Sequence, residues 1–344
     1  MLLFIVKRLA WAVLMVAIVS LITFVIFIGL PDRTINSRQG LVTPNLQGQW
    51  HLDGHSMPQK YVLFLKHVAL HGDFGESMRQ PIKVRQMLTE ALPVTASLVI
   101  GGTILFLLLS FPIGLLSALR PRSLLDKGLM VLLLIGVSAH PVFLGLILSY
   151  FLGFHWHVFP IAGYCNMHYH ATDVCGGPRY WAYHMVLPWI TFAFLFAALY
   201  ARMIRASVAE ALEEDYVRTA HAKGAGMFRI MRHHVARNAL LPVVSMLGMD
   251  VGIAFGGSIF IETVFDLPGV GQQLYRALGG ADEPVILGVA LLVSVAVVLA
   301  NLFADLLYCL IDPRIGMKTS RHGAAEMQLR RRRRASTQEL TEPA

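Results

Sequence analysis

Six apolar runs, each near or above the length that crosses a bilayer, constrain this chain more than any other feature of its sequence. They cover residues 9–30, 94–119, 128–153, 185–201, 240–261 and 285–309. A transmembrane helix needs about 20 apolar residues, so the shortest run, 185–201, is marginal. Either its charged or polar neighbours snorkel or the helix borrows flanking residues. The runs predict an all-α integral membrane protein with six transmembrane helices, since a chain that is 56% hydrophobic and 15% charged is neither disordered nor typical of a soluble domain.

The basic residues report orientation in the membrane. If both termini are cytoplasmic, 20 of the 29 Lys and Arg residues lie in cytosolic segments, as the positive-inside rule requires. Most of the others lie between Arg33 and Arg85, in a long external loop where the rule is weak. The net charge of +8 is therefore a topology signal, and we expect no nucleic-acid partner. Residues 1–30 lack a good signal-peptidase site, so the first span is expected to be uncleaved.

A charged, helix-patterned segment over 212–242 separates the fourth and fifth runs. Apolar or small residues recur at helical spacing up to Ala220, and a second amphipathic stretch places Met227, Met231 and Val235 along one face. Gly224 and Gly226 interrupt the pattern between them. The segment predicts helix, glycine turn, helix at the membrane surface, with small residues that let another protein approach the backbone. A solvated cytoplasmic loop is the plain alternative.

This segment resembles the coupling loop, or EAA loop, of type I ABC importer permeases, in the form found in the dipeptide/oligopeptide/nickel branch. Arg218 and Thr219 stand where Glu and Ala are usual, and the gap from Gly224 to Pro242 is longer than in the short general consensus. The resemblance implies that one set of residues contacts a partner ATPase: Asp215, Tyr216, Arg218, Thr219, Ala220, Ala222, Lys223, Gly224, Asn238 and Pro242.

Further motifs of the same branch follow in the expected order. Residues 71–77 resemble its "hGDfG-S" turn, residues 141–145 resemble a stretch of its third helix, and Asp282 stands where it has an acidic residue before a proline. Residues 256–271 resemble the "GG…E-x-x-F…PG-x-G" signature of the branch, and residues 305–314 resemble its ending. The resemblance implies structural roles for Gly256, Gly257, Glu262, Phe265, Pro268, Gly269, Gly271, Asp305, Asp312, Pro313 and Arg314.

The resemblance implies a MetI-like permease fold in a bacterial inner membrane. The permease domain would cover 91–314, after a first span at 1–30 and an external loop at 31–90 with short helices near 59–71 and 84–92; a basic tail at 315–344 is expected to be disordered. The implied partners are a second permease, two cytoplasmic ATPases that bind ATP and Mg, and an external solute-binding protein. The sequence has no phosphate-binding glycine loop or nucleophile–base set, so we expect neither catalysis nor a cofactor in this chain.

Four residues are candidates for the translocation path: His140, Pro141, Asp250 and Asn301. A buried Asp costs about 2.5–3.5 kcal/mol at the centre of a span, so Asp250 is expected either to meet the amino group of a substrate or to bond another helix. His140 either lines the path or is a hydrogen-bonded interior histidine. Proline at 141 is expected to kink its helix.

The external loop over 154–184 leaves two questions open. Cys165 and Cys175 either form a disulfide or remain thiols. Four histidines are weak metal-ligand candidates, because His-x-His spacing alone fixes no geometry: His155, His157, His168 and His170.

Three functions remain open at this point. Import of di- and oligopeptides is the commonest role in the branch. Import of a nickel chelate, another metal chelate or a glutathione-type solute is the alternative. An ion-coupled secondary transporter that uses Asp250 and Asp305 is the alternative from a different class, although the internal repeats of that class are not apparent.

Overall fold

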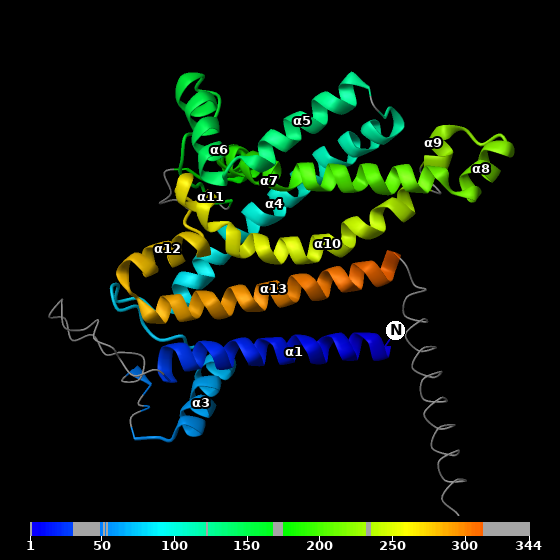
Figure 1. The fold of residues 1–344 in the computed structure, drawn as a ribbon. Coiled ribbons are helices and arrows are strands. Elements are labelled where there is room, and N and C mark those ends of the chain that lie inside the picture. The colour runs from blue at the N-terminus through cyan, green and yellow to red at the C-terminus, as the bar shows by residue number, and fades with distance from the viewer. Residues whose placement is uncertain are drawn as a thin grey trace, which may run out of the picture.

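The computed structural model describes residues 2–29, 49–50, 52, 54–121, 123–167, 175–231 and 235–311, and this part of the chain is helical apart from turns and two isolated bridges. Five of its helical stretches are long and apolar enough to cross a membrane. Figure 1 shows them stacked with their axes running mostly across the view. They are α1 with η1 (Leu2–Phe24, Val25–Gly29), α4 (Val84–Leu119), α7 (Pro178–Glu213), α10 with α11 (Ala236–Gly257, Ile259–Val264) and α13 (Glu283–Ile311).

The single helix expected over 128–153 is broken in the structure. α5 (Leu124–Ser138) and α6 (Pro141–Leu148), which continues as η3 (Ser149–His155), meet at a bend of 105°. Pro141 is the first residue of α6, and His140 before it has φ −63° and ψ 139°. The proline ring disfavours the helical region for the residue before it, and the extended conformation of His140 separates α5 from α6. The helices α4, α7 and α10 continue through their internal prolines, so Pro141 favours the break without requiring it. The pair gives a sixth span only if both arms are counted as one.

The fourth apolar run belongs to a helix twice its length. α7 has 36 residues, which corresponds to about 54 Å. Residues 202–213, expected in the cytoplasmic loop, continue this helix, because charged side chains end an apolar run without ending a helix. The short helix expected near 84–92 is likewise the start of α4, whereas the one near 59–71 is present as α3 (Met57–Leu65) and η2 (Lys66–Leu70).

The main core lies between α4 and α7. Phe106, Phe192 and Tyr200 are almost fully buried in it. Glycines on α4 allow the close approach, because a Cβ at Gly102 would overlap the Phe192 ring and one at Gly114 would meet the backbone oxygen of Ala201. Small residues serve this purpose in membrane helices generally.

The remaining described helices complete the two ends of the bundle. α1 packs on α13, and its end is held by a cluster of Phe24, Ile28, Trp50 and Phe64. α12 (Val270–Gly280) joins α11 to α13 at that same end. α8 (Asp215–Ala222) and α9 (Met227–Ile230) lie at the other end, beyond α7 (Figure 1).

Candidate functional site

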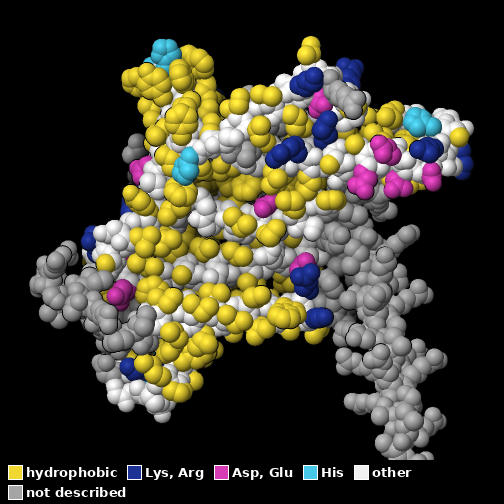
Figure 2. All heavy atoms as spheres, viewed as in Figure 1, with side chains coloured by type: hydrophobic (Ala, Val, Ile, Leu, Met, Phe, Trp, Pro, Cys, Tyr) yellow, Lys and Arg dark blue, Asp and Glu magenta, His cyan; other side chains and the backbone are white. Residues whose placement is uncertain are grey.

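The helix–turn–helix at the end of α7 has the predicted order, with different boundaries. α7 stops at Glu213 because Glu214 is extended (φ −68°, ψ 146°), and α8 begins at Asp215 rather than continuing from Leu212. Gly224 ends the turn after α8 with φ +77°, a conformation that favours glycine. Figure 2 shows charged side chains of both signs gathered over the end of α7 and over α8.

One face of α8 packs against the core and the other is exposed. Val217 is 3% exposed, and Tyr216 and Ala220 pack against the main core. The outward residues are exposed: Asp215, Arg218, Thr219, Ala222, Lys223 and Gly224. A Cβ built on Gly224 meets no atom within 4 Å. The segment therefore holds a surface of small and charged residues in a fixed place beyond the bundle.

The apolar face predicted for Met227, Met231 and Val235 is only partly present in the structure. Met231 and Val235 are buried as predicted, but Met227 is 42% exposed and its neighbour Phe228 is 80% exposed. Phe228 was missed by sequence reasoning, although an aromatic residue on the charged side of an amphipathic helix is a usable signal. Asn238 and Pro242 belong to α10 rather than to the loop; Pro242 is exposed, and the side chain of Asn238 lies outside the described residues.

A buried ion pair joins α5 to α7 near this segment. Arg205 Nη2 lies 2.9 Å from Asp126 Oδ2, and Ser117 of α4 donates a hydrogen bond to the same carboxylate. The Asp126 side chain is 6% exposed and that of Arg205 is 38% exposed. Ser123 caps the first turn of α5, where its Oγ accepts from the Asp126 N–H at 3.1 Å. Sequence reasoning missed this pair, because 79 residues separate its members.

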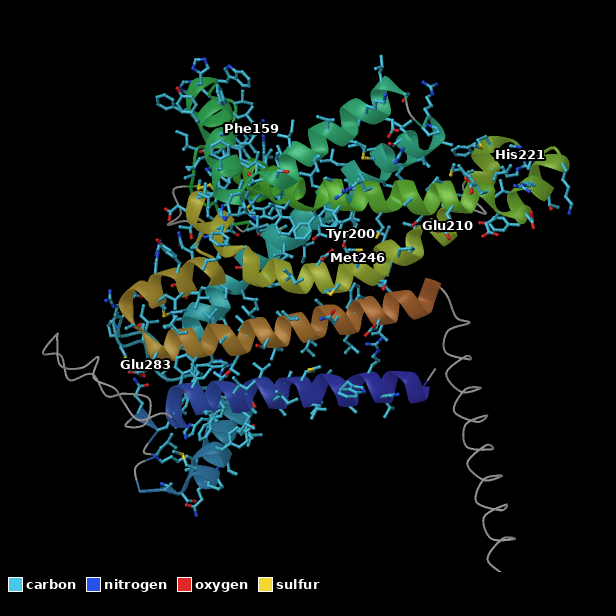
Figure 3. All side chains as sticks on the ribbon, viewed as in Figure 1. Phe159, Tyr200, Glu210, His221, Met246 and Glu283 are labelled. Carbon is cyan, nitrogen blue, oxygen red and sulfur yellow. A yellow bond between two sulfur atoms is a disulfide. The ribbon has the colours of Figure 1, made fainter. Side chains whose placement is uncertain are left out.

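The path candidates lie at three separate helix contacts and are not brought together. Asp250 is 9% exposed, and Tyr200 Oη donates a hydrogen bond to its Oδ2 at 2.7 Å. Figure 3 places Tyr200 between α7 and α10. The bond to another helix, one of the two roles left open for Asp250, is thus the contact seen in the structure, and a contact with substrate stays a prediction.

The other candidates sit elsewhere. His140 is exposed at the α5–α6 bend, next to Pro141, where its Nδ1 accepts from the Val142 N–H at 3.4 Å and its ring meets Phe260. Asn301 donates to the Val297 carbonyl of its own helix at 3.0 Å. Asp305 of the family ending forms an ion pair with Arg8 at 2.9 Å. Asp312, Pro313 and Arg314 lie outside the described residues.

Glu262 is the centre of the glycine-rich signature. It is fully buried on α11, and its carboxylate accepts hydrogen bonds from Thr95 Oγ1 at 2.7 Å, Ser258 Oγ at 2.9 Å and the Gln272 N–H at 2.8 Å. These donors come from α4, from the α10–α11 junction and from α12. A buried carboxylate is stable only when its hydrogen-bonding capacity is met, so this residue fixes the three elements together.

The glycines of that signature differ in their surroundings. A Cβ on Gly269 would overlap Thr95 and the Glu262 carboxylate, and one on Gly271 would come within 2.7 Å of the Ile259 backbone. Gly256 and Gly257 have no atom within 4 Å of such a Cβ, so the close packing expected for them is not seen within the described chain. Phe265 is buried, and Pro268 lines a hollow of about 620 Å³ near the start of α4.

The 71–77 turn and the acidic residue before the last span meet. In the 71–77 turn, Gly72 and Gly75 have φ +59° and +83°, and Ser77 donates a hydrogen bond to the Asp282 carboxylate. The Met78 N–H donates to the other oxygen of Asp282 at 3.1 Å. The turn is thereby fixed to the junction of α12 and α13.

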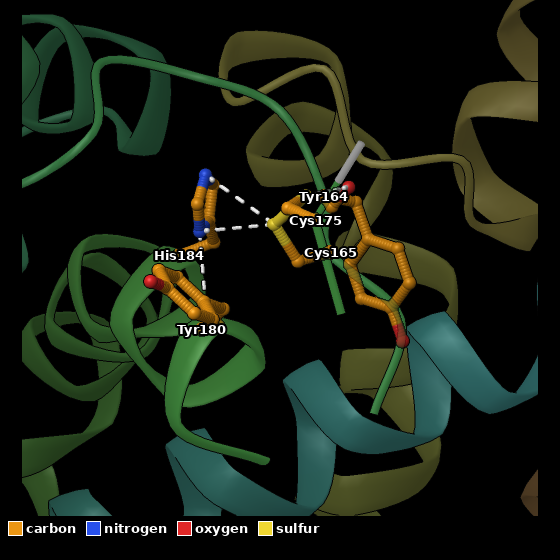
Figure 4. The surroundings of a disulfide bond; sticks show 5 residues. All are labelled: Tyr164, Cys165, Cys175, Tyr180 and His184. Atoms are coloured by element: carbon orange, nitrogen blue, oxygen red, sulfur yellow. Dashed lines mark hydrogen bonds between the residues drawn. A yellow bond between two sulfur atoms is a disulfide. The ribbon is translucent and has the colours of Figure 1, made fainter. Parts of the chain in front are cut away.

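Cys165 and Cys175 form a disulfide, which resolves the alternatives left open by the sequence (Figure 4). His184 Nδ1 lies 3.4 Å from Cys165 Sγ. Burial raises the pKa of the neighbouring Tyr164, which lines the same hollow as Pro268. No three His, Cys, Asp or Glu side chains gather as a metal site in the described part of the chain; His155 and His157 belong to that part, whereas His168 and His170 lie outside it.

Comparison with known proteins identifies the family. Residues 110–317 match the family described as "Binding-protein-dependent transport system inner membrane component". The chain is 34% identical to the probable D,D-dipeptide transport system permease protein of Escherichia coli over 91% of this chain and 97% of that one. It is 32% identical to the dipeptide transport system permease protein of Bacillus subtilis over 87% and 93%. It is 36% identical to the oligopeptide transport system permease protein of the same species over 76% and 82%.

These matches agree with the motifs and with the apolar helices of the structure. The chain belongs to the binding-protein-dependent inner membrane components, and within them to the dipeptide/oligopeptide permease branch of ABC importers.

Proposed function

We propose that this chain forms half of the translocation path of an ATP-driven importer of di- and oligopeptides, and that α8 and the turn at Gly224 dock on a cytoplasmic ATPase. The supporting observation is the geometry of this segment. Its inner face is held by Val217, while Ala222 and Gly224 stand exposed with no bulky side chain in front of them. The peptide substrate class comes from the named functions of the relatives.

A motion of α8 has a direct route into the membrane. α8 follows α7 after one extended residue, and α7 contacts α5 through Arg205 and Asp126 and α10 through Tyr200 and Asp250. Closure of the ATPases on ATP would displace α8 and, with it, α7 and the helices bonded to α7. The path would then open alternately to each side. A second permease would supply the other half of the path, and an external solute-binding protein would deliver the peptide.

The alternative of an ion-coupled transporter has less support. It uses Asp250 and Asp305 as relays, and both carboxylates already have partners, Tyr200 and Arg8, within the chain.

Substitution of Ala222 by Trp tests the docking. The side chain is exposed on the last turn of α8, so the bulk should block a partner without disturbing the core. We expect the variant to reach the membrane, to lose most of the co-purifying ATPase and to lose peptide uptake.

Ala69→Trp on η2 is the matched control, since Ala69 is also exposed but lies in the external segment. It should retain the ATPase. Normal ATPase binding and uptake in Ala222→Trp would contradict docking at α8. Uptake of a metal chelate in place of peptides would leave docking intact and correct the substrate.

A further inference from the structure

A hollow of about 490 Å³ lies between α1 and α13, outside the elements that the proposed function uses. Its walls are apolar and come from Trp11, Ala12, Met15, Val298 and Leu302. Its polar residues are Lys7, Arg8, Asn301 and Asp305. Figure 2 shows basic and acidic side chains together where α1 begins and α13 ends. The hollow therefore has charged residues at its opening and an apolar interior.

The opening carries an excess positive charge. Arg8 is paired with Asp305 at 2.9 Å, so these two charges offset one another. Lys7 is exposed, and no acidic partner for it is found in the described part of the chain. Asn301 adds an amide that already donates to Val297 and keeps an acceptor. A ligand at this opening would therefore meet the positive charge of Lys7 beside the Arg8–Asp305 ion pair.

The position of the hollow matches the boundary between lipid headgroups and acyl chains. The apolar spans run over Val6–Ile28 and Glu283–Leu307, so Lys7, Arg8 and Asp305 stand at their ends. Trp11 is 52% exposed one turn further in, and tryptophan favours this interfacial depth. Basic pockets between transmembrane helices bind anionic headgroups.

We propose that this hollow binds one anionic phospholipid. Its phosphate meets Lys7 and the Arg8 guanidinium, and one acyl chain lies along Met15, Val298 and Leu302. The lipid would cover α1, whose described packing against the bundle is mainly through α13. A zwitterionic headgroup has no net charge, so its attraction to Lys7 would be weaker than that of an anionic headgroup.

The test is native mass spectrometry of the full chain with its accompanying subunits, after exchange into nanodiscs that contain equal amounts of phosphatidylglycerol and phosphatidylcholine. We expect one phosphatidylglycerol molecule to be retained preferentially. Lys7→Gln should lower its retention about five-fold. Asp305→Asn should raise it, because Arg8 then contributes its full charge.

Lys127→Gln is the matched control, since Lys127 is an exposed lysine near the same end of the bundle but outside the hollow. It should leave retention unchanged. Equal retention of the two lipids by the unmodified protein, or an equal loss in Lys7→Gln and Lys127→Gln, would overturn the proposal. Size-exclusion profiles identify any variant that has lost its fold, and the opposite signs expected for positions 7 and 305 separate lipid binding from loss of structure.

Discussion

At the scale of single residues, Gly271 is the glycine of the signature at which an added side chain would meet backbone atoms. An added Cβ would lie 2.7 Å from Ile259 Cα and 2.9 Å from its nitrogen, which are backbone atoms that cannot turn away. Overpacking of this kind costs about 1–3 kcal/mol, and it would also displace the Gln272 N–H from Glu262. We therefore expect Gly271→Ala to lower the melting temperature in detergent by several degrees.

Gly279 on the same helix is the control. It has no atom within 4 Å of an added Cβ, and alanine is favoured over glycine in a helix by up to about 1 kcal/mol. Gly279→Ala should leave the melting temperature unchanged or raise it. Similar losses in both variants would mean that the Gly271 contact does not limit stability.

The sequence identified these glycines as a motif but could not rank them. Gly256 and Gly271 look alike in a sequence, yet one faces open space and the other a backbone. The Cβ of Gly271 would meet the Ile259 backbone and the Glu262 carboxylate. Thr95 holds that carboxylate from 167 residues away along the chain, and the two meet only in the folded chain.

At the scale of elements, the Asp126–Arg205 pair is the polar connection between α5 and α7. Removing one partner leaves a buried charge without compensation, which is costly, although the partial exposure of Arg205 reduces the effect. We expect Asp126→Asn and Arg205→Gln each to lower the melting temperature. The double variant should lose less than the sum of the two losses.

This double-mutant cycle reports the coupling directly. Strictly additive losses would show that the two side chains do not interact, and the route from α7 to α5 would then have to run through apolar packing alone. Lys127→Gln, next to Asp126 but exposed, controls for a general effect of charge.

The apolar runs predicted which segments form long helices better than they predicted the residues at which those helices begin and end. Hydropathy measures the part of a helix that sits in lipid, so α7 was predicted as 17 residues and has 36. The break in the third run was expected only as a kink at Pro141. Its 105° bend depends on how both arms pack, for which the local sequence holds no signal.

At the scale of the whole molecule, the disulfide provides a test of orientation. Cys165 and Cys175 are bonded, and the predicted topology places them outside and Cys309 at the inner end of the last span. A membrane-impermeant maleimide should label no cysteine of this chain in intact cells. After treatment with an impermeant reductant it should label Cys175, because Cys165 is only 1% exposed. Labelling that needs lysis even after reduction would reverse the topology.

A Cys165→Ser, Cys175→Ser variant is the control for that labelling, since it keeps Cys309 alone and should stay unlabelled in intact cells.

The family and its order of motifs were readable from the sequence over most of the chain. The contacts that hold the helices together could not be predicted from the sequence. Nothing in the sequence indicates that Ser77 pairs with Asp282 or that Tyr200 pairs with Asp250.

The continuity of α7 from Tyr200 to Glu213 restricts how this chain can change in length. One inserted residue in that stretch would turn everything beyond it by about 100° and advance it by about 1.5 Å. Tyr200 would still reach Asp250, but Val217 would leave its place in the core and the outward surface of α8 would face another direction. Four inserted residues would bring the helical phase back to within about 40°. Insertions and deletions compatible with function therefore belong outside this stretch or come close to whole turns.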